Sequence, residues 1–119
     1  MAEGAIFVGW GQPIPGREKA SLEVFSESVQ FWMQKQQQGE ITSFEAFALE
    51  PHGGELWGFA VIRGDQAKLM ELRYSPEVLR HDNRATAVVQ NFGVVTAIPP
   101  EQVQQFYAGY QQDISDLTS

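Results

Sequence analysis

The chain has 119 residues, a formal net charge of −7 at pH 7 and an isoelectric point of about 4.7. This length fits one domain, so we expect residues 1–119 to form a single domain. Nucleic acids and anionic membranes attract basic patches, and the eight Lys and Arg residues here are scattered along an acidic chain. We therefore expect neither nucleic acid nor a membrane as a partner.

The absence of Cys excludes disulfides, Cys-ligated zinc, iron–sulfur clusters and thiol catalysis. Because the chain also has only two His residues, no metal site is expected, and no cofactor is predicted. Residues 1–9 have no basic leader, and no segment reaches the roughly 20 apolar residues that a membrane span needs. These features predict a soluble, cytoplasmic protein.

The first half of the chain predicts three strands and one helix. Residues 5–11 (AIFVGWG) form a short apolar run bounded by a breaker-rich loop, which is typical of a strand. Residues 17–38 carry apolar side chains at helical spacing without Pro or Gly, and Gly39 suits the end of a helix. Residues 41–50 and 55–63 predict two further strands, joined by a hairpin turn at Pro-His-Gly-Gly.

The second half predicts two more helical segments, a strand and a final helix. Asp65 is a suitable N-cap for a helix, and Ser75-Pro76-Glu77 has the cap, N1 proline and acidic first turn of another that reaches about Asp82. Residues 85–98 contain no charged residue and are rich in β-branched side chains, which predicts the last strand. A helix follows Pro99-Pro100, and Thr118-Ser119 are expected to fray. The apolar stripe of this helix comprises Val103, Phe106, Tyr107, Tyr110, Ile114 and Leu117.

The order β-α-β-β-α-β with a C-terminal helix predicts an α+β, ferredoxin-like fold. In this arrangement a four-stranded antiparallel sheet carries both crossover helices on one face. Both faces of the predicted sheet are apolar, since in the first strand Ile6, Val8 and Trp10 alternate with Phe7. We expect the uncovered face to pair with a second copy in a homodimer. The alternative is that the C-terminal helix covers this face of its own sheet.

The central third of the chain resembles the dimeric α/β-barrel superfamily. The resembling segments are residues 39–45 (GEITSFE), 49–54 (LEPHGG), 58–59 (GF) and 62–65 (IRGD). They are similar in particular to a group of small bacterial proteins of unknown function, related to YCII-like and antibiotic-monooxygenase-like domains. The resemblance implies that two ferredoxin-like subunits join their sheets into a barrel with helices outside. Because the superfamily includes monooxygenases, isomerases and haem-degrading enzymes, the fold alone selects no reaction.

Two residues are candidates for acid–base chemistry. His81 stands beside Asp82 in the only His–Asp pair of the chain, and a neighbouring carboxylate can hold an imidazole pKa near neutrality. The more ordinary interpretation is a pair of polar residues at a helix end. Glu45 lies in a strand between Phe44 and Phe47, where burial would raise its pKa. Its more ordinary role is an edge-strand charge that reaches solvent.

The predicted ligand-binding residues are Trp10, Glu45, Trp57, Arg63 and Asn91. The two Trp side chains could line a cleft for a flat ligand, although aromatic residues on a sheet more often form core or interface. The first hypothesis for function is an uncharacterised homodimeric domain with a small-molecule cleft. The alternative is a cofactor-independent monooxygenase- or isomerase-like enzyme that acts on a small aromatic or polyketide-like compound.

Overall fold

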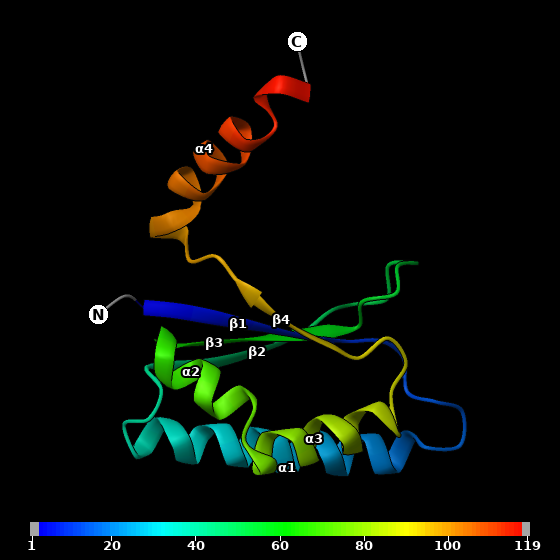
Figure 1. Cartoon of the computed structure of the whole chain (residues 1–119). Coiled ribbons are helices and arrows are strands. Elements are labelled where there is room, and N and C mark those ends of the chain that lie inside the picture. Colours follow the sequence, from blue (N-terminus) through cyan, green and yellow to red (C-terminus); the bar gives the residue numbers. More distant parts are fainter. Residues whose placement is uncertain (1–2, 118–119) are drawn as a thin grey trace.

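The computed structural model of the protein describes residues 3–117 (Figure 1). The expected fraying of Thr118 and Ser119 lies outside the described residues. The elements in chain order are β1 (Glu3–Trp10), α1 (Glu18–Gln37), β2 (Ser43–Ala48), β3 (Gly58–Asp65), α2 (Gln66–Arg73), α3 (Pro76–Thr86), β4 (Gly93–Ala97), the short 3₁₀ helix η1 (Pro100–Gln102), α4 (Val103–Asp113) and the 3₁₀ helix η2 (Ser115–Leu117).

The four strands form one antiparallel sheet in the order β2-β3-β1-β4. Helices α1, α2 and α3 lie together on one face of this sheet (Figure 1). Asp65 and Ser75 cap α2 and α3 as the sequence predicts, each accepting a hydrogen bond from the backbone N–H three residues later. The predicted ferredoxin-like α+β architecture is therefore confirmed.

The most deeply buried part of the core lies where α2 packs against the two central strands, β1 and β3. Ile62 and Leu69 are 0% exposed and Ile6 is 2% exposed, and Trp32 joins them from α1. On β1 and β3 the core residues alternate with residues of the other face, as a strand requires. This alternation fixes which residues face the helices and which face away.

A cluster of apolar residues lies on the opposite face of the sheet, which is uncovered within the described residues. Phe59 stacks between Phe7 and Phe47, with ring centroids 5.5 and 5.1 Å away. Val95 pairs with Phe7 across β4 and β1, and it is 55% exposed. We call the surface formed by these four residues and Val61 the open face. The alternative expectation, in which the C-terminal helix covers this face of its own sheet, is wrong.

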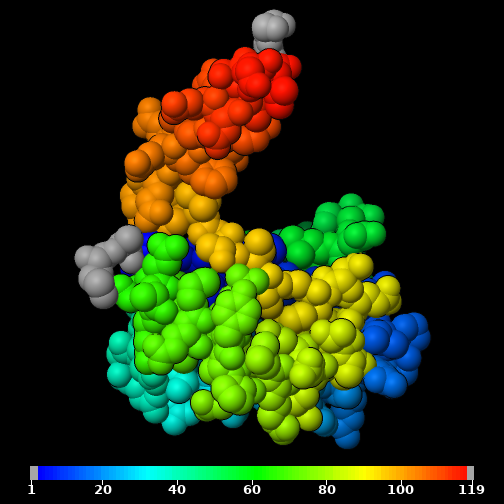
Figure 2. Space-filling view, in the orientation of Figure 1, coloured from blue at the N-terminus to red at the C-terminus, as the bar shows by residue number. Residues whose placement is uncertain are grey.

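Helix α4 projects away from the sheet on the side of the open face (Figures 1 and 2). Its start is held by η1, because Glu101 accepts a hydrogen bond from Arg63 Nη2 at 2.8 Å and Gln102 Nε2 donates to the Glu3 carbonyl at 2.8 Å. Arg63 also forms an ion pair with the Glu3 carboxylate. These contacts tie η1 to the ends of β1 and β3 and set the direction in which α4 leaves.

The strand predicted over residues 85–98 is wrong in its first half. Helix α3 continues to Thr86, and the backbone N–H groups of Val88 and Val89 donate to the Ala85 carbonyl, so the β-branched pair closes the helix end. Asn91 then adopts a left-handed backbone with φ 54°, which interrupts any extended run. Only Gly93–Ala97 joins the sheet, because β propensity depends on the partner strand available.

The connection between β2 and β3 is longer than the predicted four-residue turn. The strands pair only over 43–48 and 58–63, and Leu49 N–H donates to the Trp57 carbonyl at 3.0 Å to close a loop. Trp57 N–H donates instead to the Trp10 carbonyl at 2.8 Å, which turns residue 57 toward β1. Loop 49–57 therefore projects from the same side of the sheet as α4, at the opposite end of the sheet (Figure 1).

Candidate functional site

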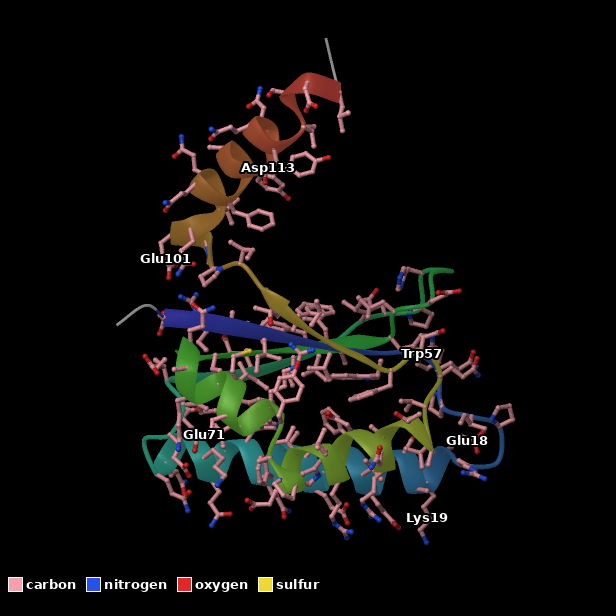
Figure 3. All side chains as sticks on the ribbon, in the orientation of Figure 1. Glu18, Lys19, Trp57, Glu71, Glu101 and Asp113 are labelled. Atoms are coloured by element: carbon pink, nitrogen blue, oxygen red, sulfur yellow. The ribbon has the colours of Figure 1, made fainter. Side chains whose placement is uncertain are left out.

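A cavity of about 480 Å³ lies between the sheet and the helices α1 and α3. Its walls are mainly apolar, since the helix-facing residues of all four strands meet Val24, Val29 and Trp32 of α1. The strand residues that line it are Ile6, Val8, Trp10, Phe44, Ala46, Ala48, Ala60, Ile62 and Val94. Figure 3 shows the side chains that project into the layer between the sheet and the helices, with Trp57 at the end remote from α4.

The Trp10 indole is positioned by the absence of a side chain on its partner in β3. Trp10 pairs with Gly58, where a Cβ atom would lie 2.6 Å from the indole ring. The ring also contacts Phe25 of α1 at a centroid distance of 5.6 Å. Leu22 and Trp57 line the same end of the cavity and are 69% and 40% exposed, so they mark its rim.

Five polar side chains interrupt the apolar lining: Ser21, Ser28, Arg73, His81 and Asp82. His81 Nδ1 lies 3.5 Å from Ser28 Oγ, and its ring packs against Phe31 at a centroid distance of 4.8 Å. Arg73 donates through Nη1 to Thr96 Oγ1 and through Nη2 to the Val94 carbonyl, both at 3.0 Å. These two bonds fix the guanidinium of Arg73 against β4.

Burial favours the uncharged forms of both His81 and Asp82. Burial lowers the pKa of His81 from its ordinary value of 6.5, with Glu27 opposing the shift and Arg80 adding to it. Burial also raises the pKa of Asp82 above its ordinary value of 3.8, with Arg73 opposing. The cavity wall therefore presents a neutral imidazole near pH 7, which can accept a proton or a hydrogen bond.

The shift at His81 predicts a pH dependence of stability. Its pKa is lower in the folded than in the unfolded state, so the unfolded chain binds this proton first as the pH falls below about 6.5. We expect the free energy of unfolding to fall between about pH 7.5 and about pH 5, and to fall less in His81→Gln. Urea denaturation at both pH values measures the difference.

His52 provides the control for this experiment, because its side chain is exposed in loop 49–57. His52→Gln makes the same substitution at this exposed position. An equal loss of stability on acidification in His81→Gln and the unmodified protein would contradict the burial of this imidazole.

The structure divides the predicted site residues between the two faces of the sheet. Trp10, Trp57 and His81 all line the cavity. Glu45 pairs with Val61 and is exposed on the open face, on the other side of the sheet from the cavity. Arg63 shares the face of Glu45, where it is engaged with Glu3 and Glu101, so neither side chain reaches the cavity.

Asn91, the remaining predicted ligand residue, lies in the exposed loop before β4 and does not line the cavity. The sequence reasoning did not single out Ser28. A signal for it was present, because Ser21 and Ser28 stand seven residues apart on the apolar side of the predicted helix, and both line the cavity. The sequence suggests Asp82 only as a partner of His81, and in the structure both residues line the cavity.

Within residues 3–117, no helix is long and apolar enough to cross a membrane. In the same part of the chain, no three His, Asp or Glu side chains are grouped so that they could hold a metal ion.

The strand order and the one-sided helix layer define a ferredoxin-like α+β protein. No protein-family model matches the chain, and no curated protein matches it in sequence. Solved structures share its fold, and the names of two of those described below call the fold ferredoxin-like.

Three of these structures illustrate the different kinds of protein that share the fold. A DABB-family protein from Mesorhizobium loti has a TM-score of 0.63 and 11% identity, over 82% of this chain and 98% of its own. A dimeric protein of unknown function from Bacteroides fragilis has a TM-score of 0.60 and 10% identity, over 80% and 94%. SnoaB, a cofactor-independent oxygenase from Streptomyces nogalater, has a TM-score of 0.53 and 17% identity, over 82% and 96%. At these identities the likeness concerns the fold alone.

Proposed function

We propose that the protein is a homodimeric α/β-barrel domain, single over residues 1–119, that binds a small, mainly apolar molecule between its sheet and its helices. The observation that carries the proposal is the cavity of about 480 Å³, whose size lies within the range of small-molecule sites. Its apolar walls with a few convergent polar groups are the usual composition of such sites. We also propose the cytoplasm as its location.

The shape and chemistry of the lining favour a flat molecule with one polar end. Trp10 and Phe25 offer aromatic surfaces at the rim end, and aromatic rings stack well on planar ligands. Ser28 and His81 offer a hydroxyl and a neutral imidazole at the helix wall. A bicyclic or tricyclic phenol, quinone or enol would fill the apolar space and hydrogen-bond to this pair.

The open face supports the dimer in this proposal. A protomer alone would leave Phe7, Phe47, Phe59 and Val95 against water, at a cost of about 25 cal/mol for each Å² of apolar surface. Two ferredoxin-like sheets that pack face to face would bury these residues. The Bacteroides fragilis neighbour is described as dimeric, which is consistent with this assembly.

Proton transfer to or from the bound molecule is a second candidate function. The observation that favours it is the pair of burial-shifted groups in one wall, His81 with a lowered pKa and Asp82 with a raised pKa. A neutral imidazole can remove a proton from an acidic carbon or hydroxyl, and the cofactor-independent oxygenase SnoaB shares the fold. This candidate is the enzymatic alternative considered from the sequence.

A thermal-shift screen tests the binding proposal. The probes are naphthols, naphthoquinones, aromatic carboxylic acids, flavins and haem, each added to the purified protein. A compound that binds the folded state only raises the melting temperature in proportion to the logarithm of its concentration. We expect bicyclic phenols or quinones to do so, and the failure of every probe to shift the melting temperature would contradict the proposal.

The same compounds separate binding from catalysis. If proton transfer occurs, the unmodified protein converts a bound phenol or enol, and His81→Gln binds it but converts it at least about tenfold more slowly. Stable binding without conversion supports the first candidate function and removes the second.

A further inference from the structure

Helix α4 is an amphipathic helix that has no packing surface on residues 3–117 of its own chain. Within the described residues, its close backbone contacts are with η1 and η2 alone. Phe106, Tyr107 and Tyr110 follow one another along one side of the helix and are 49%, 60% and 57% exposed. Three large aromatic side chains in one stripe are typical of a helix that packs on another surface.

The length of α4 also indicates that the helix packs on another surface. It has 11 residues, and isolated helices shorter than about 12 residues are marginal in water. The chain is also more extended than one compact body, with a radius of gyration of 16.4 Å against about 13.5 Å expected for its length. A helix held out in this way needs an external surface to stabilise it.

The anchoring of η1 excludes the open face of the same chain as that surface. The Arg63–Glu101 ion pair and the Gln102–Glu3 hydrogen bond hold the start of the helix at the end of the sheet. From there α4 leads away from the sheet, and Figure 2 shows an open hollow between α4 and loop 49–57. A second sheet seated on the open face would occupy this hollow.

We propose that α4 of each subunit packs through Phe106, Tyr107 and Tyr110 on the partner subunit, as an arm exchanged between the two copies. The inference rests on the homodimer of the proposed function and adds a second contact to it. With 1.5 Å of rise per residue, α4 spans about 16 Å, which exceeds the spacing of about 10 Å between packed sheets. The helix therefore reaches beyond the partner's sheet to its flank.

The charge of α4 favours a second copy over a membrane or nucleic acid. Its only charged residue is Asp113, and no Lys or Arg lies between Val103 and Asp113. Anionic lipids and phosphates attract basic helices, so neither would hold this one. In a two-fold dimer the contact occurs twice, which doubles its contribution to the assembly.

The test uses the full chain with Phe106→Ser and Tyr110→Ser together. The matched control is Gln105→Ser with Gln112→Ser, which places the same residue on the opposite side of the same helix. We expect the aromatic variant to dissociate at about 10- to 100-fold higher concentration than the unmodified dimer, and the control to remain within about twofold. Sedimentation equilibrium measures both dissociation constants.

A second measurement identifies the surface directly. In a dimer formed from one isotope-labelled and one unlabelled subunit, filtered nuclear Overhauser spectra are expected to connect the Phe106 and Tyr110 rings to protons of the other subunit. Connections within one subunit alone, in an intact dimer, would overturn the arm exchange. An unmodified protein that is monomeric at every concentration would instead overturn the dimer of the proposed function.

Discussion

Val95→Glu is expected to convert the dimer into a folded monomer. Val95 lies on β4, opposite Phe7, and 55% of it is exposed within one subunit. A carboxylate at this position stays in water when the subunit is alone, so the fold should tolerate it. In a face-to-face dimer the same carboxylate would be buried among Phe7 and Phe59 without a partner, and this occurs twice because both subunits carry the change.

The size of the effect follows from the cost of burying an unpaired charge. Several kcal/mol of lost association free energy correspond to a dissociation constant raised by about 100-fold or more. The control is Leu79→Glu, the same type of change at a 43% exposed position on α3 of the helix layer. Equal dimer stability in Val95→Glu and Leu79→Glu would show that the open face is not the interface.

Ala46→Phe is expected to abolish binding of any molecule in the cavity. Ala46 lies on β2 with its side chain on the helix-facing side, where it lines the cavity beside Ala60. A phenyl ring here would occupy space that a flat ligand needs, and the cavity offers room for it without displacing the core. We expect affinity for a compound found in the thermal-shift screen to fall by about 100-fold or more.

Folding and binding are separated by measuring both in the same variant. The melting temperature of Ala46→Phe without ligand is expected to equal or exceed that of the unmodified protein, because the ring buries apolar surface. Ala67→Phe, on the exposed side of α2, is the matched control and should bind normally. Undiminished binding in Ala46→Phe would show that the ligand binds to another surface and not in the cavity.

The architecture was predictable because it depends on periodicity and caps. The alternation of Ile6 and Val8 with Phe7 identifies both faces of β1 from the sequence. The caps at Asp65 and Ser75 marked the starts of α2 and α3 correctly. Local chemistry decides these features, so the sequence contains them directly.

The end of α3 was not predictable in the same way. Val88 and Val89 favour a strand by propensity, yet they have no neighbouring strand at that point, and Val89 forms only an isolated bridge with Pro13. Tertiary pairing overrides propensity for such residues. The same reason explains why the strand predicted from residue 85 begins at Gly93.

The candidate site was predictable in part. Aromatic and His residues were recognised by type, and Trp10, Trp57 and His81 do line the cavity. The parity of a strand tells which face a side chain occupies but not how far the helices stand from that face. For this reason Glu45 and Arg63 were grouped with Trp10 in one site, although the sheet separates them.

The homodimer is the claim that the open face, the barrel and the exchanged arm all require. Sedimentation equilibrium of the unmodified protein, from nanomolar to high micromolar concentration, tests it most directly. The predicted result is a single species of twice the 13.3 kDa chain mass at micromolar concentration. A species of 13.3 kDa throughout that range would contradict it.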